Sequence, residues 1–369
     1  MRLRRLTLTD FRNYESLTWR PSDRISVVTG PNGSGKTNLL EAVSLLTPGR
    51  GLRGARVGEF ARLGSAGRWG VHGWIERGGA AHEVATGAGE GDRRVFRLDG
   101  VAPRNQAEVA GVAACVWLTP QMDRLFVEGA SGRRRFLDRL VWAVEPGHAR
   151  EVSAYEAAMA GRNRLLAQGG ADAGWLAGLE DSMARHAVAV TAARAGLVAR
   201  LNGVLVAGAA GAFPAARLVL VDGMAERLGE APALALEDWL RTALASGRGA
   251  DAASGGAGVG AHRADMRLED AETGLAAALA STGQQKALLI GVVLGHAVLV
   301  AGVRGFWPLL LLDEPAVHLD AGRRAALWEA LVEGGAGQVF ITGTDREAFS
   351  VLEGRAAFVR TGDGAVVAD

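Results

Sequence analysis

The pattern of apolar and polar positions divides the chain into three parts. Up to about residue 120, apolar and polar residues mostly alternate, as around Leu6 and Leu8, which predicts β-strands. From about Arg133 the apolar residues recur at threes, fours and sevens, the spacing of amphipathic helices. Beyond about residue 260, strand-like and helix-like runs alternate again. This order predicts an α/β body formed by both ends of the chain and interrupted by a helical insertion.

Shorter signals locate individual elements. Asp99-Gly100 and Asp363-Gly364 are hairpin-turn dipeptides. Leu309–Leu312 and Val339–Thr342 are continuous apolar runs, which are typical of buried parallel strands. The helical middle carries two apolar stripes that we interpret as core faces: Phe136, Leu137, Leu140, Val141 and Val144, then Leu179, Met183, Val190, Leu197, Leu201 and Val204.

The expected fold class is therefore α/β, with two structural parts. Residues 1–125 and 256–369 would form one discontinuous domain, and residues 126–255 would form an inserted helical lobe. The segment 245–260 is rich in Gly, Ala and Ser, and we expect it to be a mobile loop or linker.

Composition narrows the possible functions. The net charge is +1, so any nucleic-acid surface must come from local segregation of charge. Cys115 is the only cysteine, which excludes an intramolecular disulfide and a thiolate zinc site, and its apolar surroundings predict a core position. The N-terminus lacks a signal-peptide core, and the apolar run Ala287 to Val303 falls short of the ~18 residues of a membrane span. We expect a cytoplasmic protein without membrane contact.

A candidate phosphate-binding loop lies near the N-terminus. Gly30 to Thr37 reads GPNGSGKT, the pattern G-x-x-x-x-G-K-[ST], between a strand-like run and a helix-like run. The backbone N–H groups of such a loop bind phosphates, Lys36 adds a point charge, and the Thr37 hydroxyl can ligate Mg²⁺. The expected nucleotide-binding residues are Gly30, Pro31, Asn32, Gly33, Ser34, Gly35, Lys36 and Thr37.

The use of lysine strengthens this assignment. Of the 41 basic residues only Lys36 and Lys286 are lysines. The planar guanidinium of arginine cannot replace a compact ammonium in a tight phosphate loop. A lysine kept at position 36 in an arginine-dominated chain therefore indicates phosphate chemistry.

Two further segments complete the candidate site. Leu309 to Pro315 reads LLLLDEP, so Asp313 and Glu314 follow a buried strand, where open α/β sheets carry their sites. Asp313 can bind Mg²⁺, and Glu314 can polarise the water that attacks a γ-phosphate. Ser281 to Lys286 reads STGQQK at the start of an apolar helix, and is either an ordinary N-cap or a second phosphate-binding end. Two chains related by a two-fold axis would use both phosphate-binding ends.

Together these segments resemble the heads of ABC-type ATPases, and in particular the RecF family, which is related to SMC and Rad50 heads. Further resemblance lies in the opening LTLTDFRNYES, in TPQMDRLFVEGASGRRRFLD (Thr119 to Asp138), in GAHRAD (Gly260 to Asp265) and in His318-Leu319-Asp320. The match runs from end to end. It implies a P-loop NTPase head with a mixed sheet, an antiparallel β subdomain and an inserted helical lobe.

The resemblance also implies roles for single residues. Arg12 would contact the nucleotide. Gln121 would lie near Mg²⁺ and the attacking water, as a catalytic residue and metal ligand. Ser281 and Gly283 would reach the γ-phosphate of the partner's ATP, and Asp320 would act across the dimer. The family often has an acidic residue where Gln121 stands.

The function implied is that of an ATP-binding, slowly ATP-hydrolysing, DNA-binding protein of recombinational repair, replication restart and the SOS response. An ATP-dependent homodimer would clamp DNA at gaps, with RecR as a partner and RecO and RecA downstream. Slow hydrolysis would fit Thr344, which stands where transporter ATPases carry a switch histidine. Candidate DNA contacts are the groups Arg2-Arg4-Arg5, Arg50-Arg53-Arg56 and Arg133-Arg134-Arg135, although arginine clusters are commonly ion-paired surface.

Two alternatives remain from the sequence. An ATPase subunit of an ABC transporter would share the three motifs, but no membrane-coupling element is visible. An unrelated P-loop kinase would not explain STGQQK. The stretch between Lys36 and Asp313 leaves room for a helical lobe but not for a very long coiled coil.

Overall fold

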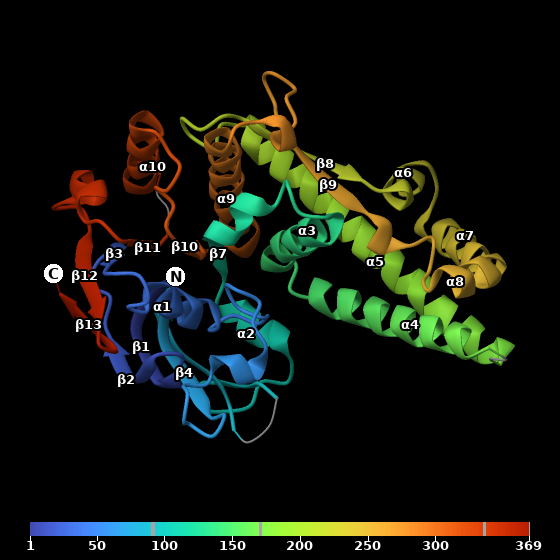
Figure 1. Cartoon of the computed structure of the whole chain (residues 1–369), viewed down its shortest axis with the longest axis horizontal. Coiled ribbons are helices and arrows are strands. Elements are labelled where there is room, and N and C mark those ends of the chain that lie inside the picture. The colour runs from blue at the N-terminus through green and yellow to red at the C-terminus, as the bar shows by residue number, and fades with distance from the viewer. Residues whose placement is uncertain (90–92, 170–171, 335–336, 369) are drawn as a thin grey trace. The chain divides into compact units, whose positions relative to one another are not determined.

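The computed structural model of the chain describes residues 1–89, 93–169, 172–334 and 337–368 (Figure 1). The chain forms two compact units, which we name the head and the lobe. The head comprises Met1–Arg124, Val204–Ala216 and Ala280–Asp369, and the lobe comprises Leu125–Gly203 and Arg217–Leu279. These units differ from the expected domains at residue 125, which belongs to the lobe, and in two longer stretches, since 204–216 belong to the head and 256–279 to the lobe. The last of these differences arises because strand β9 (Asp265–Asp270) pairs with β8 (Ala216–Val221).

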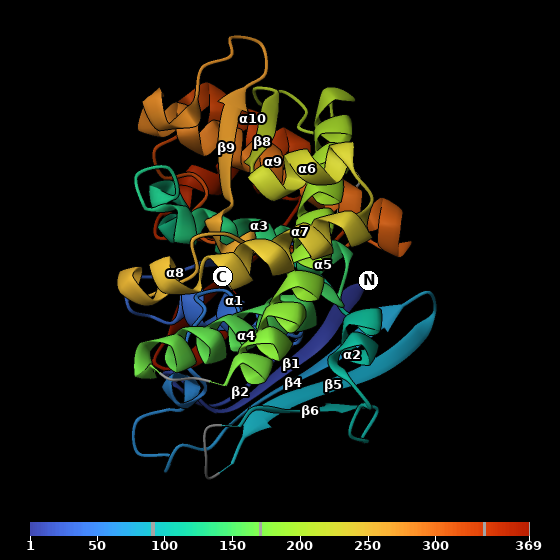
Figure 2. The same ribbon diagram turned by 90° about the vertical axis from the view of Figure 1, so that its right-hand side faces the viewer.

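The antiparallel part of the head is a five-stranded sheet in the order β2-β1-β4-β5-β6 (Figure 2). Leu6 and Leu8 face the core, as their alternation predicts. A shift in register after Leu3 marks a bulge in β1, and it allows Leu3 and Leu6, three positions apart, to be buried together. The strands are β1 Arg2–Phe11, β2 Tyr14–Trp19, β4 Trp69–Arg77, β5 Ala80–Ala88 and β6 Val95–Leu98.

The second sheet of the head joins the two ends of the chain. Its order is β13-β12-β3-β11-β10-β7, and every pairing is parallel except that of β12 with β13. The strands expected at 309–312 and 339–342 are confirmed as β10 and β11, and both are buried throughout. The strands are β3 Ile25–Thr29, β7 Cys115–Leu118, β10 Leu309–Leu312, β11 Val339–Gly343, β12 Ala357–Gly362 and β13 Ala365–Ala368.

Both expected hairpin turns are present. Asp99 and Gly100 have φ values of 50° and 81°, and Asp363 and Gly364 have values of 48° and 73°. Positive φ at both central positions suits the twist of a two-residue hairpin. The second turn connects β12 to β13 and so forms the edge of the parallel sheet.

The parallel strands end at a common edge of the sheet, and the candidate site residues follow them. Gly30 comes directly after β3, Asp313 after β10 and Thr344 after β11. Parallel pairing therefore brings together residues that are far apart in sequence. Helix α1, whose first residue is Lys36, also begins at this edge.

The head helices pack beside these sheets. Helix α9 confirms the expected buried apolar helix, with Ser281 as its N-cap and Gly305 at its end with a φ of 70°. By length and composition α5 and α9 could each cross a membrane, but 72% of the apolar window of α9 is buried inside the protein. The helices are α1 Lys36–Ser44, η1 Val57–Phe60, α2 Gln106–Val112, η2 Pro120–Arg124, α9 Thr282–Arg304, α10 Ala321–Glu333 and η5 Glu347–Leu352.

The lobe is mostly helical. The expected apolar stripes lie in α3 and α5, and Met183, Val190 and Leu240 are among the residues of a buried core. The elements are α3 Ala130–Val144, α4 His148–Gln168, α5 Ala173–Val206, β8 Ala216–Val221, α6 Gly223–Glu230, α7 Ala233–Ser246, α8 Arg248–Ser254, η3 Ala261–Arg263, β9 Asp265–Asp270 and η4 Ala277–Leu279.

The expectation of a mobile linker at 245–260 was wrong. Helix α8 occupies Arg248–Ser254, and its Asp251 is buried. The Asp251 carboxylate lies 2.8 Å from Nη1 of the fully buried Arg162, and it accepts a hydrogen bond of 2.9 Å from the backbone N–H of Gly258. A buried ion pair thus anchors a segment whose composition alone suggests disorder.

Candidate functional site

The phosphate loop connects β3 to α1 in the head. Gly30 has a φ of 147°, and a Cβ there would lie 2.7 Å from the backbone oxygen of Thr361, so only glycine fits. The Lys36 ammonium lies inside the loop, where it donates to the carbonyls of Gly30 at 2.7 Å and Pro31 at 3.0 Å. Burial lowers the pKa of Lys36, and the charges of Glu314 and Asp313 oppose this effect.

The structure brings Thr37 and Asp313 together, although 276 positions separate them. The Thr37 hydroxyl lies 3.0 and 3.1 Å from the two carboxylate oxygens of Asp313. The Thr342 hydroxyl donates to the same carboxylate at 2.7 Å and accepts from the backbone N–H of Glu314 at 3.0 Å. Glu314 has a φ of 49°, an uncommon conformation for this residue type. Hydroxyl and carboxylate oxygens therefore meet beside the phosphate loop.

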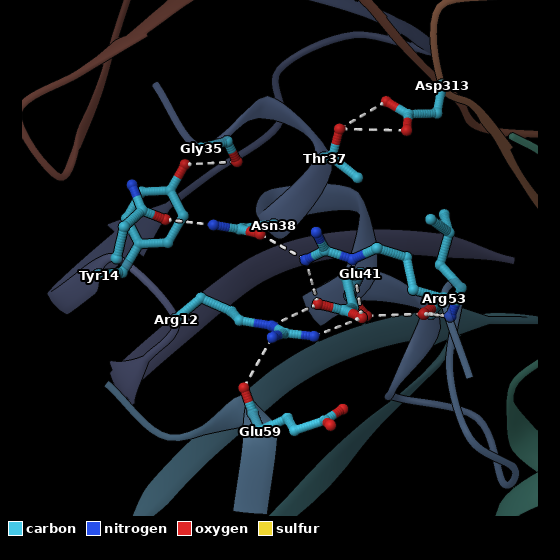
Figure 3. A network of polar contacts seen from close by, with 12 residues as sticks. Arg12, Tyr14, Gly35, Thr37, Asn38, Glu41, Arg53, Glu59 and Asp313 are labelled. Carbon is cyan, nitrogen blue, oxygen red and sulfur yellow. Dashed lines mark hydrogen bonds and ion pairs between the residues drawn. The ribbon is translucent and has the colours of Figure 1, made fainter. Parts of the chain in front are cut away.

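Arg12 lies in a network centred on the fully buried Glu41 of α1 (Figure 3). Arg12 contacts both carboxylate oxygens of Glu41, at 2.8 and 3.1 Å, and also donates to the backbone oxygen of Glu59 at 2.7 Å. Arg53 contacts the same carboxylate at 3.1 and 2.5 Å. One buried carboxylate thus holds two guanidinium groups at the helix that follows the phosphate loop.

Side chains from the turn between β1 and β2, from β2 and from α1 connect this network to the loop itself (Figure 3). Arg53 donates to Asn38 at 2.5 Å, and Asn38 donates to Asn13 at 2.7 Å. The Tyr14 hydroxyl donates to the carbonyl of Gly35 at 3.1 Å. Burial raises the pKa of Tyr14, so this hydroxyl stays protonated and remains a donor.

The STGQQK segment forms a second helix N-terminus. Ser281 Oγ accepts from the backbone N–H of Gln284 at 3.4 Å, and Gln284 Oε1 accepts from the backbone N–H of Ser281 at 2.9 Å. A Cβ at Gly283 would lie 3.0 Å from the carbonyl of His318, so the helix approaches the segment before Asp320 closely. Asp320 caps α10 by accepting from the backbone N–H of Arg323 at 2.8 Å. Within the described residues, no hydrogen bond joins Ser281, Gly283 or Asp320 to the phosphate loop.

Gln121 does not join the cluster of Thr37 and Asp313. It is exposed on η2, and among the described residues it makes no hydrogen bond to either side chain. Instead Asp123, two residues later, forms a 3.0 Å ion pair with the buried Lys286 of α9. The second lysine of the chain therefore has a structural partner within the head.

Sequence reasoning missed Glu41, Arg53, Asn38, Thr342 and Asp123. A signal existed for Glu41, because it interrupts the apolar run Leu39, Leu40, Ala42 and Val43 and so predicts a buried charge with a partner. The sequence indicates Arg53 only as a candidate DNA contact, and in the structure it pairs with Glu41. Arg133 is likewise engaged, by Asp265 at 2.7 Å.

Comparison with known proteins gives close relatives along the whole chain. The DNA replication and repair protein RecF of Allorhizobium ampelinum is 47% identical over 98% of this chain and 97% of its own length. The RecF protein of Mesorhizobium japonicum is 46% identical over 98% of this chain and 96% of its own length. The chain belongs to the RecF family. A family model described as an AAA domain matches residues 5–77 of this RecF-family chain.

Solved structures confirm the expected fold class. The recombination mediator protein RecF-ATPrS in the RecFOR pathway matches with a TM-score of 0.87 at 21% identity, covering 100% of this chain and 98% of that one. An Smc head bound to the C-winged helix domain of ScpA matches with a TM-score of 0.54 at 14% identity, covering 100% and 98% of the two chains. The chain therefore has the ABC-type ATPase head fold of the P-loop NTPases, with a mixed sheet, an antiparallel sheet and a helical insertion.

Proposed function

We propose that this RecF-family chain binds ATP, hydrolyses it slowly and uses it to hold DNA during recombinational repair. The observation that carries the proposal is the juxtaposition of the Lys36 loop with the Thr37–Asp313 oxygen cluster across 276 positions. The ammonium held by the loop suits a nucleotide phosphate. The hydroxyl and carboxylate oxygens beside it suit a divalent metal ion. The relatives named as DNA replication and repair proteins, and the neighbour named RecF-ATP, support the same role.

The oxygen cluster fits Mg²⁺. Thr37 and Asp313 offer only hard oxygen donors, the ligand type this ion prefers, and they already lie within 3.1 Å of each other. In this proposal Thr37 and Asp313 hold the ion, and Gln121, which lies apart from them on η2, is a third candidate ligand by family resemblance alone. When bound, Mg²⁺ neutralises charge on the phosphates, and Lys36 with the loop N–H groups of Gly33 to Thr37 orients them.

Glu314 is the proposed residue for water activation. Its backbone is fixed by the hydrogen bond from its N–H to Thr342, directly beside Asp313. A carboxylate at this point can orient and polarise water toward a terminal phosphate. Lys36 and Gln121 would support the reaction, and Arg12 would contact the nucleotide.

ATP would also join two copies of the chain. Ser281 and Gly283 form a helix N-terminus that suits a phosphate, and within the described residues this end has no hydrogen bond to the loop of its own chain. In a two-fold dimer each such end could meet the partner's nucleotide, with Asp320 acting across the interface. Hydrolysis would remove the bridging phosphate and open the dimer.

The proposed DNA contacts are to phosphates and so independent of sequence. Exposed arginines such as Arg50, Arg56 and Arg135 are better candidates than Arg53 and Arg133, which are engaged within the protein. The proposed setting is DNA gaps in the cytoplasm, during repair, replication restart and the SOS response. RecR is the proposed partner, with RecO and RecA loading downstream.

DNA retention with and without ATP tests the proposal. Wild-type protein and the Lys36→Arg variant are compared on gapped, duplex and single-stranded DNA of equal length, at fixed salt. We expect ATP to increase retention of wild type on DNA and to have no effect on the variant, because a guanidinium does not fit between the carbonyls of Gly30 and Pro31. Equal retention of wild type with ATP, ADP or no nucleotide would contradict an ATP-controlled clamp.

A further inference from the structure

A hollow lined by two arginines opens beside the start of the phosphate loop. Its volume is about 390 Å³, and it is lined by Thr29, Gly30, Pro31, Thr344, Arg346 and Arg360. We name it the two-arginine hollow. All six residues belong to the head, and none of them is acidic.

Strand β12 positions both arginines. Arg360 pairs in register with Thr29, the last residue before the loop. Its side chain is exposed, whereas the next residue, Thr361, is buried, as alternation along a strand requires. Phe358 lies on the same face as Arg360, and the guanidinium of Arg346 lies 4.6 Å from the centre of the Phe358 ring. The two arginines therefore lie on one side of β12.

The loop wall of the hollow is held in place by the same strand. The hydroxyls of Thr361 and Ser34 are 2.7 Å apart, and Thr361 also donates to the carbonyl of Thr29 at 3.2 Å. A Cβ on Gly30 would lie 2.7 Å from the Thr361 carbonyl, so strand and loop approach as closely as glycine allows. Strand β12 therefore holds the Gly30 wall of the hollow in place.

The two arginines give the lining of the hollow its positive charge. Glu353 pairs with Arg346 at 3.7 Å and is 59% exposed, so this pair is long and open to solvent. The Lys36 ammonium, bonded to the carbonyls of Gly30 and Pro31, adds a third cation next to the wall. Guanidinium groups bind tetrahedral oxyanions through paired N–H donors.

We propose that the two-arginine hollow is a second oxyanion subsite, which takes a phosphate group at the mouth of the phosphate loop. The phosphate is either the terminal group of the bound nucleotide or free phosphate released from it, and both have the same chemistry. This inference rests on the proposed ATP function and extends it to Arg346 and Arg360. These arginines lie outside every motif that the sequence identifies.

Two titrations test the subsite in Arg360→Gln and Arg346→Gln. The first measures the Kd of ATP and of ADP, and the second measures the Kd of inorganic phosphate for protein saturated with ADP. Arg355→Gln is the matched control, because it removes an exposed positive charge of the same unit that does not line the hollow. Removing a charged donor should weaken binding at least about fivefold in one of the two titrations.

The outcomes distinguish the two sources of phosphate. If the hollow takes the terminal phosphate, ATP binding weakens in Arg360→Gln while ADP binding stays at the wild-type value. If it takes released phosphate, only the phosphate titration weakens. If Arg360→Gln and Arg346→Gln give wild-type Kd values in both titrations, the subsite is rejected. This holds even if the same variants bind DNA more weakly.

A failure of the proposed ATP function would give a different result from a failure of the subsite. Wild-type protein that binds neither ATP nor ADP would contradict the ATP function itself. The phosphate titration is then run on nucleotide-free protein, where loss of phosphate binding in Arg360→Gln but not in Arg355→Gln still supports the subsite. Equal phosphate affinity in all variants under that condition rejects it.

Discussion

Glu41 holds Arg12 and Arg53 together at the helix that follows the phosphate loop. Its carboxylate is fully buried, and both of its oxygens contact each guanidinium. A bidentate pair fixes the plane of a guanidinium as well as its position. Without the carboxylate two like charges would lie side by side in a partly buried place. Glu41 therefore fixes the position of Arg12 beside the helix that follows the phosphate loop.

The Glu41→Gln substitution tests this positioning. The amide keeps the shape but loses the charge, and its single oxygen accepts fewer guanidinium bonds, so we expect the Kd of ATP to rise about tenfold. Calorimetric titration measures the change. Glu59→Gln is the matched control, because the Glu59 side chain caps Arg56 while only its backbone oxygen accepts from Arg12.

A double-mutant cycle separates positioning from general damage. If Glu41 acts through Arg12, Glu41→Gln should change the ATP affinity little when Arg12 is already alanine. The same tenfold loss in both backgrounds would show that Glu41 acts on the loop in another way.

Glu314 gives a prediction about turnover rather than binding. Glu314→Gln should bind ATP with nearly wild-type affinity but hydrolyse it at less than about a tenth of the wild-type rate, a barrier increase of ~1.4 kcal/mol or more. The reason is that the amide cannot polarise water, while the backbone bond to Thr342 is kept. Single-turnover hydrolysis measures this, and a near-normal rate would point to another base.

The residues predicted from sequence are those fixed by local motifs. Lys36, Thr37, Asp313 and Glu314 follow from short patterns next to strands, and the structure brings these segments to one edge of the sheet. Glu41 and Asp123 could not be assigned, because their partners come from distant elements. A carboxylate reveals its role only when the fold supplies the cation, as Arg12 does for Glu41 and Lys286 for Asp123.

At the scale of elements, buried ion pairs connect the helices of the lobe. Asp138 of α3 accepts from Arg194 of α5 at 2.8 Å through each of its oxygens, and it lies 2.8 Å from Nε2 of His148 in α4. Burial alone would raise the pKa of Asp138, but hydrogen bonds from His148 and Arg194 outweigh it and lower that pKa. Three helices therefore share one charged contact.

Asp138→Asn should destabilise the lobe by about 3 kcal/mol near pH 7, because Arg194 is left buried without its counter-charge. A carboxylate with a lowered pKa stabilises the fold above its unfolded pKa, about 3.9, and this contribution is lost as the pH falls through the folded pKa. The gap between wild type and variant should therefore shrink below about pH 4. Urea unfolding of the lobe transition at several pH values measures it.

Asp181→Asn is the control for this prediction. Asp181 also pairs with an arginine of α5, Arg185 at 3.0 Å, but it is 43% exposed. Exposed pairs contribute at most ~1 kcal/mol, so this variant should unfold almost like wild type. An Asp138→Asn variant as stable as Asp181→Asn would show that the buried pair does not hold the lobe together.

The elements themselves were largely predictable, except where tertiary contacts override composition. Periodicity gave α9 and the buried strands β10 and β11, because their apolar patterns are long or continuous. Periodicity did not predict the helix at 248–254, because its small residues form no apolar pattern. This helix is anchored by the ion pair between Asp251 and Arg162. The predicted domain boundary near residue 256 was also wrong, because the sequence of β8 or β9 alone does not show that the two strands pair.

At the scale of the whole molecule, the proposed nucleotide site needs both ends of the chain. Strand β3 pairs with β11 and β12, and Thr37 meets Asp313 only when that sheet has formed. The STGQQK end of α9 belongs to the same unit, yet within the described residues it makes no hydrogen bond to the loop. This helix N-terminus, proposed to bind a phosphate, is the basis for expecting a second copy.

The chain should be largely monomeric without nucleotide and dimeric with ATP, because binding free energy at a shared phosphate appears as dimer stability. Ser281→Arg should leave ATP binding by the monomer nearly unchanged, since Ser281 caps α9 and does not contact the loop of its own chain. It should block dimerisation and ATP-dependent retention of DNA, because a bulky cation would occupy the place of the partner's phosphate. Light scattering with ATP compares this variant with Ser16→Arg, which adds the same charge at an exposed position on β2, and with Glu314→Gln, which should remain dimeric. A Ser281→Arg protein that still dimerises with ATP would show that this end of α9 does not act on the partner.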